Sequence, residues 1–280
     1  MISSCSFRTV ELSDPAYELE GLRTVTVKSR ALGRRADVTV WVPQGHRAGA
    51  LLILLHGVYG SHWVWSMKGG VHRTAQQLLD SGDIEPMVIV MPSDGLGRDG
   101  SGYLNHEQRG RAEEWIMDEV PAIARLAAPV LERDTRLAIA GLSMGGYGAL
   151  RLGAKYAARF SAISAHSAFA DITGMQHFVE EPLNEYTERQ PADELSALYW
   201  LRKHRDRLPP LRFDCGSGDS LLAVNRRLHQ DLESDNIKHR YEEYSGGHDW
   251  QYWREHVAKT LRFVSNATAE ATRGLPDQLH

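Results

Sequence analysis

Short apolar runs alternate with longer stretches of helical spacing along most of the chain. The runs that have the length of strands fall at 51–55, 87–91, 137–140, 160–165, 211–215 and 239–244. Most are continuously apolar, as in parallel strands covered on both faces, whereas the more polar last run predicts an exposed edge. Between or after them we expect helices near 71–81, 107–128, 144–157, 193–206, 220–234 and 250–266. This alternation indicates a doubly wound α/β fold.

Two earlier segments have a different pattern. Residues 23–30 and 36–42 alternate polar and apolar positions around a short polar turn, which predicts an antiparallel hairpin at the sheet edge. With the hairpin included, we expect a mostly parallel eight-stranded sheet with helices on both faces. Pro121 falls inside the helical stretch 107–128 and should kink or divide it.

Ser143 is the strongest candidate for chemistry. It stands at the centre of Gly-Leu-Ser-Met-Gly, directly after the apolar run 137–140 and directly before a small-residue helix. A sharp strand-to-helix turn leaves no room for side chains two positions before and after the serine, and Gly141 and Gly145 meet that demand. This context indicates a nucleophile elbow, which lifts the serine hydroxyl clear of the sheet.

A serine nucleophile needs a base and an orienting acid, which follow it along the chain in such folds. Asp219 is the candidate acid because it lies in a Gly-Ser-Gly loop after the strand 211–215, whereas its competitor Asp214 lies inside that strand. His248 is the candidate base. It follows a strand and a Gly-Gly turn, downstream of Asp219.

An oxyanion hole needs two backbone amides near the serine. We expect one from Met144, at the start of the helix, and the other from Val58, in the loop after the strand 51–55. His56, at the start of that loop, is interpreted as a packing residue that shapes it.

Aromatic residues flank both candidate loops and suit a pocket for an acyl or aryl group. Tyr59 and Trp65 follow the oxyanion loop, and Trp250 follows His248. We expect these three to contact substrate, while Trp253, one helical turn beyond Trp250, is expected to pack in the core.

No cofactor or metal site is expected. The acidic helical positions have no histidine or cysteine beside them at metal-ligand spacing, so we interpret them as solvated surface: Glu113, Glu114, Asp118 and Glu119. The glycines of the loop 95–102 do not form a phosphate-binding pattern.

Length and composition predict one domain over residues 1–280. Residues 171–208 fit no pattern and are expected to form a substrate-shaping insertion, and 267–280 a flexible tail. The formal net charge of −4 argues against a nucleic-acid partner. No run reaches transmembrane length, and the first thirty residues lack a basic region followed by an apolar one, so we expect a cytoplasmic protein without membrane contact. Cys5 and Cys215 lie far apart, which makes a structural disulfide unexpected.

The motifs resemble those of the esterase D and tributyrin esterase-like branch of the α/β-hydrolases, which is related to S-formylglutathione hydrolases, feruloyl esterases and mycolyltransferases. The matching segments follow the family's order from about residue 50 to 265: Leu-Leu-His-Gly-Val-Tyr-Gly-Ser61, Met-Val-Ile-Val-Met-Pro-Ser-Asp94, Gly-Leu-Ser-Met-Gly-Gly-Tyr-Gly-Ala-Leu150, Cys-Gly-Ser-Gly-Asp219 and Gly-Gly-His-Asp-Trp250. The resemblance implies the triad Ser143, Asp219 and His248, with oxyanion amides from Val58 and Met144.

The expected function is a cofactor-independent serine carboxylesterase that acts on a small-molecule ester with a short or aryl acyl group. A thioesterase of the S-formylglutathione type or an acyltransferase is the alternative within the same chemistry. A binding protein that keeps the fold without turnover is a third reading, disfavoured because the whole triad is present. The oligomeric state, a homo-oligomer included, is left open by the sequence.

Overall fold

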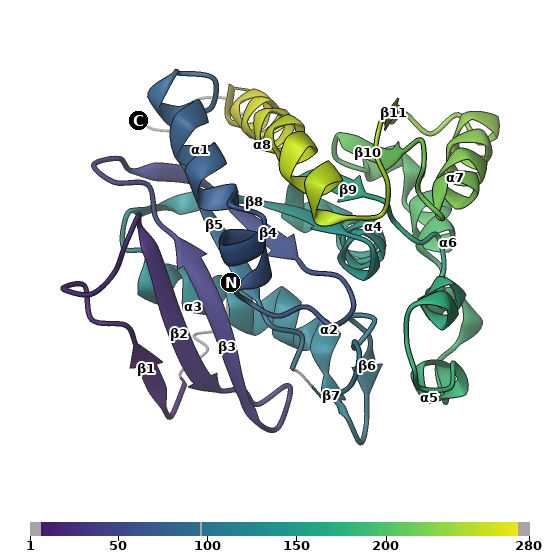
Figure 1. The fold of residues 1–280 in the computed structure, drawn as a ribbon, viewed down its shortest axis with the longest axis horizontal. Helices are drawn as coiled ribbons and strands as arrows, with labels where there is room; N and C mark the ends of the chain where they lie inside the picture. The colour runs from purple at the N-terminus through teal and green to yellow at the C-terminus, as the bar shows by residue number, and fades with distance from the viewer. Residues whose placement is uncertain (1–6, 96, 274–280) are drawn as a thin grey trace.

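The computed structural model describes residues 7–95 and 97–273. Its centre is a nine-stranded sheet in the order β1-β2-β3-β5-β4-β8-β9-β10-β11 (Figure 1). The strands of this sheet are β1 (Val10–Leu12), β2 (Leu22–Lys28), β3 (Arg35–Trp41), β4 (Ala48–Leu55), β5 (Met87–Pro92), β8 (Leu131–Leu142), β9 (Phe160–His166), β10 (Leu211–Gly216) and β11 (Arg240–Tyr244). A separate small sheet pairs β6 (Asn105–His106) with β7 (Gly110–Arg111).

Helices follow most strands of the main sheet. They are α1 (Val71–Asp80), α2 (Ala112–Glu114), α3 (Val120–Ala127), α4 (Met144–Lys155), α5 (Asn184–Thr187), α6 (Ala197–Lys203), α7 (Leu222–Ser234) and α8 (Trp250–Arg273). Two π-helical turns (Val64–Lys68 and Trp115–Glu119) and short 3₁₀ turns supplement them. Within residues 7–95 and 97–273, no helix combines the length and apolar character needed to cross a bilayer.

Strand direction divides the sheet into two parts. From β5 to β11 in sheet order, neighbouring strands are parallel, whereas β1, β2 and β3 pair antiparallel at one edge. The carboxyl ends of β4, β8, β10 and β11 therefore lie at the same edge of the sheet. The loops that carry the candidate site residues follow these four strands.

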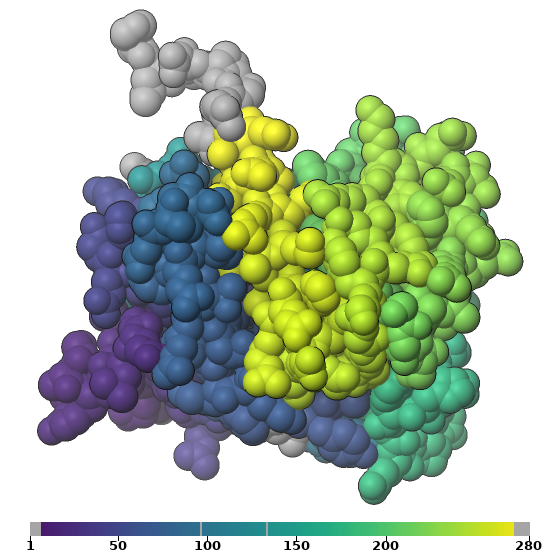
Figure 2. All heavy atoms as spheres, turned by 45° about the horizontal axis from the view of Figure 1, so that its top comes forward, coloured from purple at the N-terminus to yellow at the C-terminus, as the bar shows by residue number. Residues whose placement is uncertain are grey.

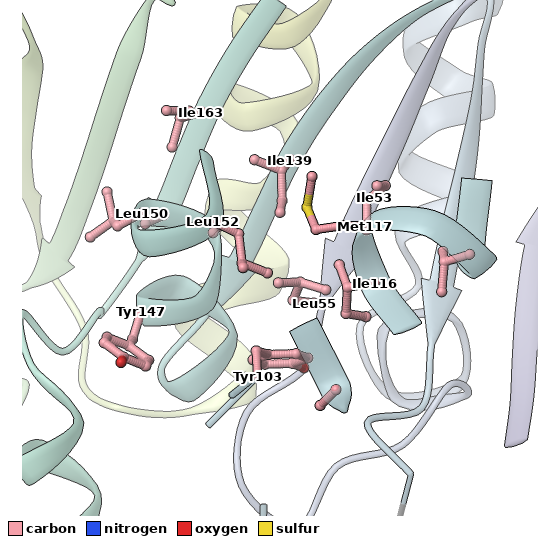
Figure 3. Packing of buried hydrophobic residues seen from close by; sticks show 14 of the residues in the cluster. Ile53, Leu55, Tyr103, Ile116, Met117, Ile139, Tyr147, Leu150, Leu152 and Ile163 are labelled. Carbon is pink, nitrogen blue, oxygen red and sulfur yellow. The ribbon is translucent and has the colours of Figure 1, made fainter. Parts of the chain in front are cut away.

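Side chains of β4 alternate between two hydrophobic cores on opposite faces of the sheet. Ile53 and Leu55 belong to the core that α3, α4 and α6 cover, part of which is shown in Figure 3. Leu52 and Leu54 belong to the core under α1 and α8. Figure 2 shows α8 on this second face, between α1 and the segment that contains α7. Burial on both faces explains the continuous apolar runs of the parallel strands.

The predicted architecture is confirmed, with one difference in the number of strands. The main sheet has nine strands rather than eight, because the three-residue β1 pairs with β2. That strand is too short and too exposed to show a hydrophobic pattern. As predicted, β11 lies at an edge. The stretch that contains Pro121 is not divided: the π-helical turn Trp115–Glu119 leads directly into α3, whose first turn holds the proline. Proline lacks an amide hydrogen, and the change of helix type falls next to it.

The prediction of a flexible tail from residue 267 is wrong for residues 267–273. Helix α8 continues to Arg273, and Ala267 and Thr268 are buried. The Thr268 hydroxyl lies 3.1 Å from the Ser161 hydroxyl. Apolar residues recur at Leu261, Val264 and Ala267, so the core-facing side of the helix extends past the expected end. Residues 274–280 lie outside the described part of the chain.

The acidic stretch is only in part the solvated surface that we expected: Asp118 is exposed and Glu114 partly so, but the other two carboxylates are buried. Glu113 is buried and contacts the buried Arg151 of α4, with 2.5 Å between its Oε2 and the Arg151 Nη2. Glu119 is also buried and accepts hydrogen bonds from two backbone amides. Arg151 also contacts Glu194, with 2.8 Å between Nη2 and Oε2. This buried arginine therefore anchors the insertion 171–208 to α4.

A second group of buried polar side chains joins β9, β10 and α8. Asp214, which is fully buried, accepts hydrogen bonds from the Arg212 guanidinium (2.6 Å) and the Tyr252 hydroxyl (2.8 Å). Its Oδ1 also lies 2.9 Å from Nδ1 of the buried His166, whose Nε2 lies 2.8 Å from the Thr260 hydroxyl. Burial alone would raise the pKa of Asp214, but His166, Arg212 and Tyr252 hold it well below its ordinary range.

This cluster predicts a specific loss of stability in acid. Because the pKa of Asp214 is depressed in the folded state, the ionised carboxylate stabilises the fold fully above the unfolded-state pKa of about 3.9, and the contribution falls as the pH drops below that value. Below about pH 4, the free energy of unfolding of Asp214→Asn should therefore fall less steeply with decreasing pH than that of the wild type, by up to about 1.4 kcal/mol per pH unit. The variant should also be less stable at pH 7 by about 3 kcal/mol or more, because Arg212 loses its nearest carboxylate.

Urea unfolding followed by tryptophan fluorescence between pH 3 and pH 7 measures both effects. The exposed Asp193→Asn is the control, and we expect it to follow the wild type. If the free energy of unfolding of Asp214→Asn fell as steeply below pH 4 as that of the wild type, the assigned role of Asp214 would be contradicted.

Candidate active site

Ser143 occupies a strained turn between β8 and α4. Its backbone has φ 53° and ψ −118°, a region that residues with side chains rarely adopt. The Ser143 amide donates to the His166 carbonyl of the next strand (2.9 Å), and its carbonyl accepts from the Tyr147 amide (2.9 Å). These two hydrogen bonds hold the turn from both sides.

The flanking glycines are required by the closeness of three backbone segments. A Cβ atom on Gly141 would lie 2.3 Å from the Gly145 carbonyl oxygen, and one on Gly145 would lie 2.4 Å from the Leu55 carbonyl oxygen. Real Cβ atoms do not approach carbonyl oxygens so closely, so α4 can start against β4 and β8 only with glycine at both positions. This close packing explains why glycine is needed two positions before and two positions after Ser143.

The structure brings the three predicted triad residues together. His248 Nε2 lies 3.0 Å from Ser143 Oγ, and His248 Nδ1 lies 3.0 Å from each carboxylate oxygen of Asp219. A carboxylate can only accept hydrogen bonds, so Nδ1 carries the proton and the Nε2 lone pair faces the serine hydroxyl. In this tautomer His248 can take a proton from Ser143.

Asp219 is held as an ionised acceptor. Its side chain is fully buried, which by itself would raise its pKa, but hydrogen bonding and charge interaction with His248 and the Leu221 amide lower it below the ordinary value. The Leu221 amide donates to Oδ1 at 2.8 Å. Asp219 therefore remains charged through the neutral range and can stabilise an imidazolium on His248.

The acid and base loops are joined to each other. The Gly218 amide donates to the Gly246 carbonyl (2.8 Å), and the Ser217 amide donates to the Tyr244 carbonyl (2.7 Å). Gly246 has φ +134°, and a Cβ there would lie 2.7 Å from the Tyr252 ring. The loops after β10 and β11 thus set the separation of Asp219 and His248 through backbone contacts.

Asp214, the competing acid, takes no part in the contacts of His248 and Ser143 described above. Its carboxylate is occupied by His166, Arg212 and Tyr252. The pleat of β10 directs it into the core, as its position inside the strand predicts.

The loop predicted to supply an oxyanion amide lies directly against Ser143. A Cβ on Gly57 would lie 3.3 Å from the Ser143 Cβ and 2.8 Å from the Leu142 side chain. Among the described residues, neither the Val58 nor the Met144 amide donates to a protein acceptor. Both amides remain predicted oxyanion donors.

The buried His56 orients the Val58 amide. Its Nδ1–H donates to the Gly57 carbonyl at 2.7 Å, and the Gly60 amide donates to the same oxygen at 3.2 Å. This carbonyl and the Val58 N–H belong to one planar peptide unit, so fixing the oxygen also fixes the direction of the N–H.

The three predicted substrate contacts differ in accessibility. Tyr59 is 61% exposed, whereas Trp65 is 1% exposed and donates through Nε1 to the Leu55 carbonyl (2.9 Å). Trp65 therefore packs in the core, with its ring pointing inward from the π-helical turn that carries it. Its contact with substrate stays a prediction, as do those of Tyr59 and Trp250. Trp250 is half-buried and packs edge-on against Trp65, with 5.6 Å between ring centroids.

Two other aromatic residues contact the histidine instead. The Trp253 ring meets the His248 ring edge-on at 5.1 Å, so this buried tryptophan packs in the core and also supports the base. Phe178, from the insertion 171–208, lies 4.9 Å from the His248 ring. No local pattern in the sequence marks Phe178, because the insertion has no regular periodicity.

Among the described residues, no group of three or more potential ligands is placed to hold a metal ion. Cys215, a free buried thiol of β10, has a strongly raised pKa, chiefly because of burial and then because of the nearby Asp219 and Asp214 carboxylates. It is therefore unsuited to act as a nucleophile.

Comparison with known proteins shows the family of the chain and supports the fold. The family model described as "Putative esterase" matches residues 29–264. An acetyl esterase of Caldicellulosiruptor saccharolyticus is 28% identical over 233 residues, which cover 78% of this chain and 84% of that protein. A solved ferulic acid esterase has a TM-score of 0.69 at 25% identity, covering 92% and 99% of the two chains.

The fluorophosphonate-binding serine hydrolase F of Staphylococcus aureus has a TM-score of 0.75 at 21% identity, covering 88% of this chain and 98% of that one. This second structure supports the fold alone. The family match extends over most of the chain and includes all the segments that carry the candidate site. The chain therefore belongs to this esterase family, has the α/β-hydrolase fold and is a carboxylic ester hydrolase.

Proposed function

We propose that this esterase is a serine carboxylesterase that hydrolyses short-chain or aryl esters through Ser143, His248 and Asp219. The observation that carries the proposal is the chain of contacts from Ser143 Oγ to His248 and on to the buried Asp219, each about 3 Å long. Such a chain activates a hydroxyl that is otherwise a weak nucleophile.

In the first half of the reaction, Ser143 Oγ attacks the ester carbonyl carbon while His248 Nε2 takes the hydroxyl proton. The carbonyl π electrons move to its oxygen, and the Val58 and Met144 amides stabilise the negative charge. The intermediate then collapses: the bond to the alcohol oxygen breaks, and His248 returns the proton to the leaving alcohol. An acyl group remains on Ser143.

In the second half, His248 takes a proton from water as the water oxygen attacks the acyl carbon. The second tetrahedral intermediate expels Ser143 Oγ, which regains a proton from His248, and the carboxylic acid leaves. Asp219 stays ionised throughout and stabilises the imidazolium that forms twice.

Removal of the serine hydroxyl is the first test. Ser143→Ala should lower kcat/KM for p-nitrophenyl acetate by about 10⁴-fold or more, because the nucleophile is lost. Ser220→Ala, outside the contacts described for the triad, is the matched control. Circular dichroism should show both variants folded. Turnover of Ser143→Ala close to that of the wild type would sink the proposal.

The identity of the acid is tested by two isosteric substitutions. Asp219→Asn should lose about 10³- to 10⁴-fold in kcat/KM, since it no longer holds the required His248 tautomer. Asp214→Asn should keep most of its kcat/KM in the folded fraction, because Asp214 does not touch His248. The reverse ranking, measured at a temperature at which both variants are folded, would show that the acid is misassigned.

We expect a preference for short acyl groups, because the serine is little exposed and an aromatic ring covers the histidine beside it. Ser143 is 2% exposed, and the Phe178 ring lies against His248. We expect kcat/KM for p-nitrophenyl acetate or butyrate to exceed that for decanoate by about tenfold or more. Phe178→Ala should reduce this ratio. A wild-type maximum at decanoyl or longer esters would contradict the preference for short acyl groups.

Methyl ferulate and S-formylglutathione in the same series test aryl-ester and thioester turnover.

A further inference from the structure

Asp99 lies where three segments at the catalytic edge of the sheet meet. Its backbone carbonyl accepts from the Tyr59 amide at 2.7 Å. Its Oδ2 accepts from the Tyr59 hydroxyl at 2.8 Å and from the Glu180 amide at 2.6 Å. Tyr59 belongs to the loop after β4, Asp99 to the loop after β5, and Glu180 to the insertion after β9. One half-buried aspartate therefore links all three.

Tyr59 directly follows Val58, the predicted oxyanion donor. Its φ is +55°, which is unfavourable for a residue with a side chain and persists only when neighbouring contacts impose it. The two hydrogen bonds to Asp99 supply those contacts, one through the backbone and one through the phenol. His56 holds the Gly57 carbonyl on the other side of Val58. The Val58 amide is thus fixed from both directions.

The link extends into the insertion. The Asp99 amide donates to Glu181 Oε1 at 3.3 Å, and the Tyr186 hydroxyl donates to Glu181 Oε2 at 2.5 Å. The same segment carries Phe178, which lies against the His248 ring. A shift of the insertion when a substrate enters would therefore be transmitted to Tyr59 as well as to the catalytic histidine.

The protonation states of Tyr59 and Asp99 favour the hydrogen bond between them. The hydrogen bond to Asp99 is the main cause that raises the pKa of Tyr59 to about 12, so the phenol remains a neutral donor. Burial acts to raise the pKa of Asp99, but the Glu180 amide and the Tyr59 hydroxyl outweigh it and lower the value. An ionised acceptor forms stronger hydrogen bonds than a neutral one.

We infer that Asp99 is a positioning residue for ester hydrolysis, which holds the Val58 amide in place through Tyr59 and couples it to the insertion. This inference rests on the proposed function. Asp99 touches none of the triad residues in the contacts described above, so its effect on the reaction is through the oxyanion loop.

Kinetics of point variants test the positioning role. Asp99→Ala should lower kcat for p-nitrophenyl acetate by about tenfold or more, because a misplaced oxyanion donor stabilises the transition state less. KM should change much less than kcat. Asp99→Asn keeps an acceptor oxygen and should recover most of the loss, and Tyr59→Phe should be intermediate because the backbone hydrogen bond remains. Asp193→Ala, at an exposed aspartate of the insertion 171–208, is the control.

Hydrogen exchange read by mass spectrometry tests the coupling independently of turnover. In Asp99→Ala, peptides that cover 56–63 and 178–186 should both exchange faster, and in Asp193→Ala neither should. Faster exchange in 178–186 alone would overturn the coupling. An active wild type with an unchanged kcat in Asp99→Ala would overturn the inference and leave the proposed function standing, whereas an inactive wild type would overturn both.

Discussion

The site depends on one unfavourable backbone conformation, that of Ser143 at the turn between β8 and α4. Holding a serine at φ 53° costs energy, on the order of 1–3 kcal/mol for such a conformation, and the surrounding structure must impose it. The sheet does so by burying β4, β8 and β9 on both faces and by pairing the Ser143 amide with the His166 carbonyl. Gly141 and Gly145 then let the backbone of the three segments approach closely enough for α4 to begin beside the serine.

Parallel strands place the aspartate and histidine side chains of the candidate site at the same edge of the sheet as Ser143. The residues that surround each aspartate–histidine pair then decide what that pair can do. Two aspartate–histidine pairs lie close together in this fold. In the Asp214–His166 pair, Arg212, Tyr252 and Thr260 occupy the remaining polar atoms, and the pair stabilises the core. In the Asp219–His248 pair, the second ring nitrogen faces Ser143, so the same chemical unit is available for proton transfer.

Much of the fold and of the candidate site was predictable from the sequence, because it depends on local pattern. Continuous apolar runs, the glycines around Ser143 and the loop positions of Asp219 and His248 each reflect a constraint that acts within a few residues. Features set by long-range packing were not predictable. Trp65 is buried although it follows the oxyanion loop, Glu113 is buried against an arginine 38 positions away, and α8 extends through buried residues that look polar in sequence. Phe178 and Asp99 reach the site from segments without periodicity.

We propose Ser143 as the nucleophile of an esterase that forms a covalent acyl-enzyme. Treatment with a fluorophosphonate, followed by peptide mapping with tandem mass spectrometry, tests it most directly. We expect a single adduct on Ser143, formed in parallel with the loss of ester hydrolysis and absent from Ser143→Ala. Complete inactivation with the adduct on another residue, or full hydrolytic activity after Ser143 is labelled, would contradict it.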